Sequence, residues 1–477
     1  MANRKKKFYV TSSIAYANAA PHLGFALEVI QADVIARYHG HLSEDVFFLT
    51  GTDEHGAKVA KAAEEIGKTP KEFVDEISEK FKALKKVLGL SNNDFIRTTD
   101  EKRHWPTVKK AWLKFKENND IYLKKYKGLY CSGCEAFITK KDLINGECCV
   151  HRIKPQIIEE ENYFFKLSKY SQKIKKAIEE NKIRIIPESR KNEILSFIKQ
   201  GLEDVSFSRP RKDLKWGIPV PDDDTQTIYV WADALVNYLS AIDYYDENEK
   251  FHKYWPADVH CIGKDILRFH AIFWPAMLLS LGLELPKTIF IHGFITVGGL
   301  KMSKSLGNVI DPFWLAEKYG TDAVRYFLLR EISPTEDGDF TLEKFETRYN
   351  ADLANGLGNF AARILALKAQ YSEIKSSKID KDIDKKIKEA EKETAQKLEE
   401  LEFSESLSVI WDLIAFGDKY INQTQAWKVS DAKSKSQIIS NLIAILNSVT
   451  DNLKPFLPET SAKITQLKKG EILFPRH

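Results

Sequence analysis

The sequence predicts an α/β fold in which a parallel sheet carries a metal-knuckle insert and is followed by an all-α helix bundle. Up to residue 114, short apolar runs alternate with segments of helical periodicity, which is typical of a parallel sheet with right-handed crossovers. Four cysteines within Cys131–Cys149 then interrupt that alternation. From about Asn350 onward, long segments rich in Lys and Glu have a helical period and no strand signal.

The composition bounds the class of protein. A chain of 477 residues with 43% hydrophobic residues suits several globular domains with a large core. The net charge of +4 gives no overall field for a nucleic acid, so any RNA contact must come from local patches. The basic segment Met1–Lys7 precedes an apolar run that is too short for a signal peptide, and no run of 18 apolar residues occurs. We therefore expect a cytoplasmic protein without membrane association.

The first elements can be assigned from periodicity. Three strands are predicted at Phe8–Ser12, Val46–Thr50 and Phe95–Thr98, and two helices at Leu23–Tyr38 and Pro70–Leu88. No Walker-type glycine-rich lysine motif follows a strand, so a phosphate site of the P-loop kind is not expected.

Two short stretches, far apart in the chain, suit a polyphosphate ligand. Lys301–Ser305 reads Lys-Met-Ser-Lys-Ser and is bordered by glycines, which suits a mobile loop whose ammonium groups follow a phosphate charge. His22 and Gly24 lie where a strand turns into a helix, and there the free N–H groups and the helix dipole favour an anion. Taken singly, each stretch also fits a simpler interpretation, namely a solvated lysine loop and a helix-capping histidine.

As a pair, these stretches resemble the HIGH and KMSKS signatures of class I aminoacyl-tRNA synthetases. Five further segments resemble the methionyl-tRNA synthetase family: Tyr9–Ser13, Tyr16–Asn18, Phe48–Gly56, Tyr229–Ala234 and Phe269–Met277. The resemblance runs from about Phe8 to Arg476. It implies a Rossmann-like catalytic domain and ATP-dependent ligation of methionine to its tRNA through methionyl-adenylate, for translation initiation and elongation. The implied partners are tRNA(Met), L-methionine and ATP with Mg²⁺.

The resemblance also implies site residues. The implied catalytic residues are His22, Lys301 and Lys304. The implied ATP-binding residues are His22, Gly24, Asp265, Lys301, Ser303 and Lys304. The implied methionine-binding residues are Ser13, Ile14, Tyr16, Asp53, Trp231, Ala234, Tyr238, Ile266 and His270. Asp53 would bind the amino group, although it would serve equally well as a helix cap. Without the family, Trp231 and Ile266 would be assigned to the core, and Ser13 and Leu235 replace the family's frequent alanine and proline.

The cysteine cluster has the spacing of a two-knuckle metal site. Cys131-x₂-Cys134-x₁₃-Cys148-x₂-His151 provides three soft thiolates and one imidazole, a set that suits tetrahedral Zn²⁺. Cys149 is interpreted as a bystander, because Cys149-x-His151 is too tight for a knuckle. Four protein ligands leave no open position, so one structural zinc per chain is expected.

The resemblance divides the chain into five segments: 1–114, first half of the catalytic domain; 115–228, connective-peptide insert with the zinc knuckle; 229–295, second half of the catalytic domain; 296–349, KMSKS loop and stem-contact region; 350–477, anticodon-binding helix bundle. The small insert argues against the valine, leucine and isoleucine enzymes. Its end, Ser208–Pro221, is cationic and aromatic, which suits either RNA contact or a rigid linker.

The sheet is expected to resume at Tyr229. Strands are predicted at Val259–Ile262 and Ile289–Ile291, with one helix from Lys264 to Leu281 between them. After the lysine loop, helices are predicted at Asp311–Tyr319 and Thr321–Arg330.

In the helix bundle, Asn359, Arg363 and Trp427 match the family's anticodon-recognition positions. Asn359 and Arg363 are one helical turn apart and face the same way, and an indole can stack an unpaired base. The alternative is that Trp427 is a core residue. Ala426 replaces the usual preceding proline, and the missing appended domain of some relatives suggests a monomer.

Two alternatives to a methionine enzyme are kept. A class I synthetase for cysteine would have its zinc in the active site, whereas here the cysteines lie in the insert. A non-catalytic tRNA- or protein-binding relative is the second alternative, because Phe25 occupies the position of the second signature histidine.

Overall fold

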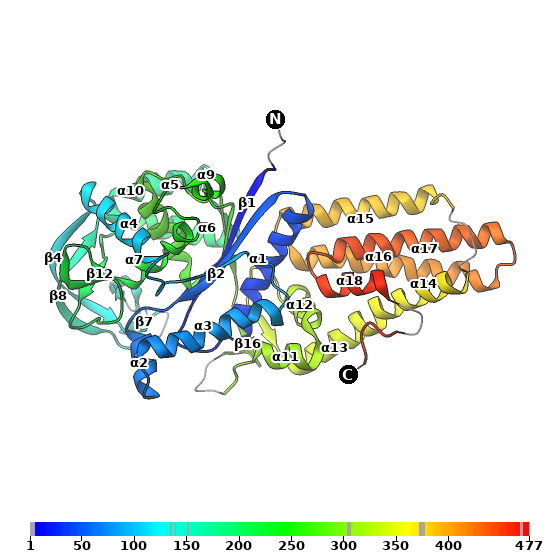
Figure 1. Ribbon diagram of the computed structural model, residues 1–477, viewed down its shortest axis with the longest axis horizontal. Coiled ribbons are helices and arrows are strands. Elements are labelled where there is room, and N and C mark those ends of the chain that lie inside the picture. The colour runs from blue at the N-terminus through cyan, green and yellow to red at the C-terminus, as the bar shows by residue number, and fades with distance from the viewer. Residues whose placement is uncertain are drawn as a thin grey trace. The chain divides into compact units, whose positions relative to one another are not determined.

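The computed structural model describes residues 5–133, 136–138, 140–149, 152–302, 307–371, 377–467 and 471–476. The chain forms two compact units (Figure 1). The first, here called the sheet unit, contains residues 1–21, 44–83 and 92–292. The second, the helical unit, contains residues 22–43, 84–91 and 293–477.

A six-stranded sheet, parallel at every pairing, organises the sheet unit. In spatial order its strands are β3 (Asp94–Arg97), β2 (Asp45–Asp53), β1 (Lys7–Tyr16), β14 (Val259–Gly263), β15 (Thr288–His292) and β9 (Arg184–Ile186). The predicted strands are confirmed, and β1, β2, β14 and β15 are almost wholly buried, as expected of a sheet covered on both faces.

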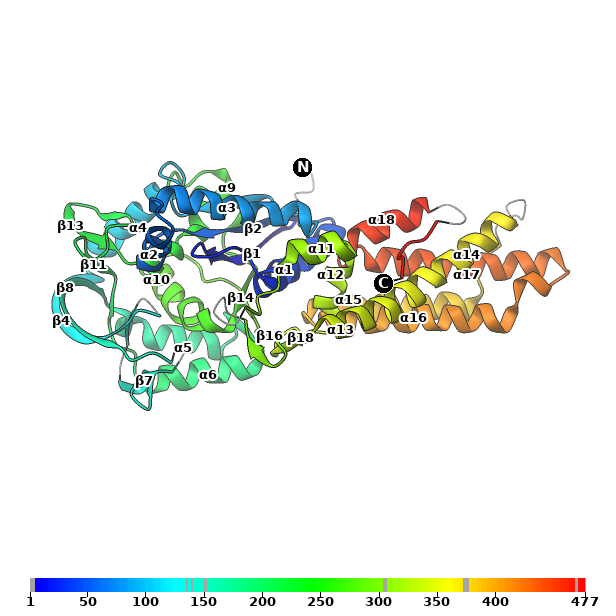
Figure 2. The ribbon, with the colours of Figure 1, turned by 90° about the horizontal axis from the view of Figure 1, so that it is seen from below.

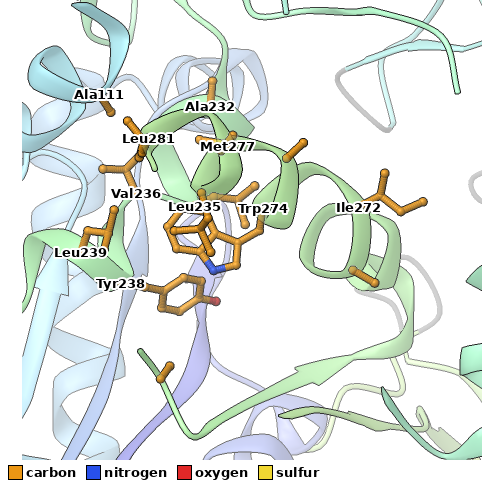
Figure 3. Packing of buried hydrophobic residues seen from close by; sticks show 14 of the residues in the cluster. Ala111, Ala232, Leu235, Val236, Tyr238, Leu239, Ile272, Trp274, Met277 and Leu281 are labelled. Atoms are coloured by element: carbon orange, nitrogen blue, oxygen red, sulfur yellow. The ribbon is translucent and has the colours of Figure 1, made fainter. Parts of the chain in front are cut away.

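Helices of the sheet unit cover this sheet and enclose an aromatic core. They are α2 (Ala57–Glu65), α4 (Trp105–Glu117), α5 (Ser171–Glu179), α6 (Glu188–Lys199), α7 (Val230–Ala234), α8 (Asn237–Ser240), α9 (Glu249–Tyr254) and α10 (Trp274–Leu281). α3 spans Pro70–Val87, close to its predicted range. Trp112 and Trp274 are among the largest fully buried side chains, and Figure 3 shows the Trp274 indole beside the ring of Tyr238.

The segment 264–281, predicted as one helix, is three short pieces. A 3₁₀ turn (Lys264–Ile266) and a π-helix (Phe269–Phe273) precede α10. Pro275 has no N–H to donate to the carbonyl of Ala271, so a regular α-helical ladder cannot pass through this point. π turns of this kind are frequent at functional sites.

The segment between α4 and α7 contains three small sheets and returns one strand to the main sheet. The first small sheet is antiparallel, with the order β10 (Val205–Ser206), β8 (Gln156–Phe165), β4 (Ile121–Cys131) and β5 (Ala136–Ile138). The other elements are the hairpin β6 (Leu143–Ile144)–β7 (Glu147–Cys148) and the sheet β11 (Ser208–Pro210), β13 (Asp223–Ile228), β12 (Pro219–Val220). The expectation that the main sheet resumes at Tyr229 is wrong, because β9 pairs with β15 through Arg184↔Thr288.

A buried ion pair explains why α1 (Leu23–His41), an early helix, belongs to the helical unit. Arg325 and Asp33 are both fully buried, with Nη1 and Oδ2 2.8 Å apart. Arg325 also donates to the carbonyls of Phe456 (2.7 Å), Pro455 (3.0 Å) and Leu88 (3.1 Å). One guanidinium therefore joins four chain segments, and its planar fork of donors is what makes this possible.

The remaining elements of the helical unit are a small sheet and a set of helices. The sheet consists of β17 (Leu300–Lys301), β16 (Ile295–Val297) and β18 (Gly338–Phe340). The helices are α11 (Pro312–Tyr319), α12 (Thr321–Arg330), α13 (Leu342–Arg348), a π-helix (Tyr349–Gly358), α14 (Asn359–Gln370), α15 (Lys381–Glu399), α16 (Phe403–Thr424), a 3₁₀ turn (Ala426–Lys428), α17 (Ala432–Leu453) and α18 (Pro458–Gln466).

The predicted helix bundle is confirmed, and α14, α16 and α17 run side by side in it (Figures 1 and 2). A Cβ at Gly417 would lie 2.5 Å from the ring of Phe360, so this glycine lets α14 approach α16 closely. None of the helices in the described part of the chain is long and apolar enough to cross a membrane.

Candidate functional site

The carboxyl ends of three adjacent strands of the sheet carry candidate ligand-binding residues. The order β2–β1–β14 brings the end of β2, with Asp53, next to Tyr16 of β1, and these two residues are direct register partners. A register irregularity between Thr11 and Ile14 lies just upstream in β1. Asp265 follows β14 and is exposed. This edge of a parallel sheet is where ligands bind in doubly wound folds.

Asp53 is the last residue of β2, and it opens the connection to α2, residues 53–56, here called the Asp53 turn. Several hydrogen bonds hold this connection. The carboxylate of Glu54 accepts two bonds from Arg97 (2.7 and 2.9 Å). The carbonyl of Glu54 accepts from the indole of Trp216 (2.6 Å), and the carbonyl of Asp53 accepts from the N–H of Ala17 (2.8 Å). Asp53 itself is only 6% exposed. The turn is therefore preorganised, and Arg97 and Trp216 are supporting residues that periodicity and motif matching did not identify.

An aromatic wall forms from α7, α8 and the π-helix. The rings of Trp231 and Phe269 are stacked, with centroids 3.6 Å apart and an angle of 7°. Both residues are only partly buried, as is Ile266, so these side chains are not enclosed in the core. Of the other candidate methionine residues, Ser13, Ile14 and Tyr16 lie on β1 and Ala234 lies on α7.

Tyr238 and His270 form a hydrogen-bonded pair within this wall. Tyr238 Oη lies 2.7 Å from His270 Nε2, and His270 Nδ1 lies 3.1 Å from the carbonyl oxygen of Ile266. A carbonyl can only accept, so Nδ1 carries a proton, and in the neutral ring Nε2 accepts from the Tyr238 hydroxyl. The π turn thus fixes the orientation of both side chains.

His260 supports this pair from behind and was missed by the sequence analysis. Its Nδ1 lies 2.8 Å from Thr11 Oγ1, and its Nε2 accepts from the Trp274 indole at 3.3 Å. Its ring centroid is 4.3 Å from that of Tyr238. Burial, with a smaller contribution from His270, holds the pKa of His260 well below its ordinary value, so His260 is neutral.

In the helical unit, His22 caps the N-terminus of α1. Its Nδ1 accepts from the N–H of Gly24 at 3.0 Å, so in the neutral ring the proton lies on Nε2. A Cβ at Gly24 would lie 2.9 Å from the His22 ring, which explains the glycine. The N–H of Leu23 donates to the carbonyl of Ile310 (3.1 Å). The N–H groups of Leu23 and Gly24, which were expected to be free, are therefore both engaged within the chain.

The lysine stretch begins in a hairpin close to α1. β16 and β17 are joined by Gly298 and Gly299 at φ +60° and +76°, a turn that requires positive φ at both positions. Asp339 accepts from the N–H of Gly299 and from Thr296 Oγ1, both at 2.7 Å. These bonds lower the pKa of Asp339 and anchor the hairpin.

Lys301 is the described lysine of this stretch. Its Nζ lies 4.9 Å from the ring centroid of Phe294, and its carbonyl accepts from Asn308 Nδ2 at 3.2 Å. Met302 Cε would be 3.6 Å from a Cβ at Gly24, so the stretch starts beside the α1 N-terminus. Ser303 and Lys304 lie outside the described residues.

In the insert, two of the four candidate metal ligands are described. Cys131 and Cys148 come from β4 and β7, yet both are buried (0% and 1% exposed) in one small cluster with Ile138. The N–H of Arg152 donates to the carbonyl of Cys148 at 2.8 Å. Cys149 is only partly buried. Cys134 and His151 lie outside the described residues.

The cationic segment at the end of the insert is more structural than its sequence suggested. Arg209 makes two bonds to the carboxylate of Glu160 (2.6 and 2.7 Å) and stacks on the ring of Tyr130, with 91% of it buried. The Trp216 indole is engaged with Glu54. Arg211 and Lys215 remain exposed. Of this segment, we therefore expect only the exposed side chains of Arg211 and Lys215 to be candidates for contact with RNA.

The three candidate anticodon residues lie on α14 and just after α16. Asn359 is exposed, and Arg363 donates to Asp418 Oδ1 (2.8 Å) and Asn422 Oδ1 (2.7 Å) on α16. Trp427 is 47% exposed, so the alternative that it is a core residue is wrong. Ala426, beside it, is buried and anchors the 3₁₀ turn.

Comparison with known proteins identifies the family. The family model "tRNA synthetases class I (M)" matches residues 8–151 and 134–365, and "Anticodon-binding domain of tRNA ligase" matches residues 380–475. Methionine–tRNA ligase of Thermotoga maritima is 46% identical over 96% of this chain and 74% of its own length. The Bacillus subtilis ligase is 40% identical over 100% and 79% of the two chains.

A solved structure agrees with these sequence matches. The Mycobacterium tuberculosis methionyl-tRNA synthetase in complex with methionyl-adenylate aligns with a TM-score of 0.92 at 38% identity, covering 99% of this chain and 97% of that one. The family match extends over more than half of the chain and the relatives over nearly all of it. This chain therefore belongs to the methionyl-tRNA synthetases, within the class I aminoacyl-tRNA synthetase family.

Proposed function

We propose that this chain ligates methionine to its tRNA in two steps, with methionyl-adenylate as the intermediate, for translation initiation and elongation. The observation that carries this proposal is the match over 99% of the chain to a synthetase solved with methionyl-adenylate. In the first step the methionine carboxylate attacks the α-phosphorus of ATP and pyrophosphate leaves. In the second, the terminal ribose hydroxyl of the tRNA attacks the methionyl carbonyl and AMP leaves.

The first step needs no general base, because the methionine carboxylate is already ionised at neutral pH. Catalysis is then positioning and charge stabilisation. We assign these roles to His22, Lys301 and Lys304, with Gly24, Asp265 and Ser303 as further ATP-binding residues. In support, His22 holds its proton on Nε2, where it can be donated to a phosphate oxygen. Mg²⁺ accompanies ATP and neutralises part of its phosphate charge.

Methionine is assigned to the carboxyl edge of the sheet. Asp53 binds the ammonium group, and the preorganised turn around it supports this role. The thioether lies against the aromatic wall, since sulfur packs well on aromatic faces. Trp231, Tyr238, Ile266 and His270 form the wall, and Ser13, Ile14, Tyr16 and Ala234 complete the set of proposed contacts.

The tRNA(Met) anticodon is assigned to Asn359, Arg363 and Trp427. An exposed amide and a guanidinium can bond to base edges, and a half-exposed indole can stack on a base. The bonds from Asp418 and Asn422 hold the Arg363 guanidinium in one orientation, which supports a recognition role.

One structural zinc per chain is assigned to Cys131, Cys134, Cys148 and His151. The two described thiols fit the metal, because they come from different strands and are buried in one cluster. When bound, zinc would cross-link β4 and the β6–β7 hairpin, whose shared cluster of buried residues is small. The thiolate ligands fit a reducing compartment, and we propose a cytoplasmic location.

Methionine-dependent exchange of pyrophosphate into ATP, measured with a panel of amino acids, tests the assignment. Exchange with methionine and not with cysteine, valine or leucine is the expected result. Exchange with cysteine would favour the alternative synthetase. If no amino acid supports exchange while the chain still binds tRNA, the non-catalytic alternative replaces the proposal.

A further inference from the structure

Four buried residues form a hydrogen-bonded series in the sheet unit, here called the Asp233 network. Asp233 Oδ2 lies 2.7 Å from His55 Nδ1, and Asp233 Oδ1 lies 2.6 Å from His104 Nε2. The network continues from His104 Nδ1 to Ser240 Oγ at 2.9 Å. All four residues are at most 2% exposed.

The protonation of the Asp233 network follows from its geometry. Burial alone would raise the pKa of Asp233, but the charge and hydrogen bonds of His55 and His104 outweigh it, and the pKa is lowered. An ionised carboxylate can only accept, so both imidazole nitrogens that face it carry protons. The pattern of donors is thus fixed, and each oxygen of the Asp233 carboxylate accepts one hydrogen bond from an imidazole N–H.

The order serine–histidine–aspartate invites comparison with a hydrolase triad, but burial argues against that role. Ser240 is 1% exposed, and its hydroxyl also lies 3.1 Å from the carbonyl of Val236. A nucleophile must reach a substrate carbonyl, which this hydroxyl cannot do. These hydrogen-bonded residues are therefore suited to a structural role, in which they hold neighbouring elements in place.

The parts that it holds belong to the two sides of the proposed methionine pocket. His55 lies two residues after Asp53, in the turn at the end of β2. Asp233 lies on α7 between Trp231 and Ala234. His104 directly precedes α4, so the carboxylate connects three separate elements.

We propose that Asp233 is a positioning residue for methionine binding, which holds the Asp53 turn and α7 at a fixed separation through His55 and His104. This inference rests on the proposed methionine pocket. Its physical basis is that a binding site loses affinity when supporting hydrogen bonds no longer fix its contact residues. The expected effect is on methionine and not on ATP.

Kinetics of methionine-dependent pyrophosphate exchange, measured with the full chain, test the proposal. Asp233→Ala removes the carboxylate that accepts hydrogen bonds from both imidazoles. KM for methionine should then rise about tenfold or more, the scale expected for losing a bond to a charged group. KM for ATP should stay within about twofold. Asp233→Asn should restore KM for methionine to near the native value, because an amide can accept from one imidazole and donate to the other. In that variant His104 would carry its proton on Nδ1, and Ser240 would accept a hydrogen bond from it.

Asp120→Ala is the matched control. Asp120 is also a fully buried carboxylate of the sheet unit, and it accepts from Lys169, Tyr170 and Ser280. Its removal should lower the melting temperature without a selective change in KM for methionine. If both alanine variants change the two KM values alike, Asp233 is merely structural and the proposal fails.

Two further outcomes must be distinguished, namely a variant that does not fold and a native protein that shows no activity. If Asp233→Ala does not fold, His104→Gln, which leaves Asp233 and His55 in contact, should still raise KM for methionine selectively, and an unchanged KM overturns the proposal. If the native chain shows no exchange with methionine, the proposed function fails. Native exchange with unaltered KM values in the variants refutes the positioning role alone.

Discussion

Replacing Trp427 by alanine tests the anticodon surface with little cost to the fold. The indole is 47% exposed in the 3₁₀ turn after α16, and the neighbouring Ala426, at 1% exposure, provides the anchor of that turn. Full burial of a large apolar side chain contributes about 1.5–3 kcal/mol. About half of the indole is already in water, so Trp427→Ala should reduce the free energy of unfolding by about 1 kcal/mol.

The effect on tRNA should be larger than the effect on stability. Stacking of one base on an aromatic side chain contributes about 1–3 kcal/mol, which corresponds to roughly a 5- to 150-fold change in affinity. We expect KM for tRNA in the charging assay to rise by that factor. Methionine-dependent pyrophosphate exchange, which needs no tRNA, should be nearly unchanged. A tRNA with an altered anticodon should be charged equally poorly by the native and variant chains.

Trp411→Ala provides the comparison within the same bundle. The Trp411 indole packs against Tyr326, with ring centroids 4.6 Å apart, so its removal should cost more stability than removal of Trp427. If Trp427→Ala lowers the melting temperature as much as Trp411→Ala, or damages exchange and charging equally, our account of the anticodon surface is refuted.

Three other substitutions test the remaining assignments. Phe25→His should raise kcat/KM for ATP in the exchange assay by about tenfold, because it restores a donor to the phosphates, and an unchanged or lower value would show that Phe25 serves packing instead. Cys148→Ser should lower the zinc content measured by atomic absorption while Cys149→Ser should not, and the reverse result would show that the ligand assignment is wrong. Gly24→Ala should raise KM for ATP in the exchange assay, because the new Cβ would lie 2.9 Å from the His22 ring and displace it; an unchanged KM would contradict the close fit of His22 and Gly24 around the phosphates.

The elements that depend on local pattern were predicted well. The strand predicted at Phe8–Ser12 lies within Lys7–Tyr16, and the helix predicted at Thr321–Arg330 has those bounds. Hydrophobic periodicity reports which face of a segment is buried, and that information lies within a few residues of chain. The two signatures and the knuckle spacing were recognisable for the same reason, since each is a short continuous string.

What the pattern missed depends on partners that are distant in the chain. β9 has three residues, and its place in the sheet follows from pairing with β15, about a hundred residues later. His260 looks like an ordinary strand residue until Thr11 and Trp274 approach it from both sides. A polar side chain is informative only with its partners, and periodicity contains no record of them.

The sequence by itself therefore determined the class of fold, the family and the chemical types of the candidate ligands. Tertiary structure decided which groups are available to act. Arg209 and Trp427 were both candidate RNA contacts in the sequence. In the structure Arg209 is buried in an ion pair with Glu160, whereas the side chain of Trp427 is exposed to solvent. The fully buried pair of Arg325 and Asp33 assigns α1, with His22 at its N-terminus, to the same unit as the lysine hairpin. The physical reason is that burial and hydrogen-bond satisfaction are properties of the packed chain, because they depend on atoms that segments remote in sequence bring together.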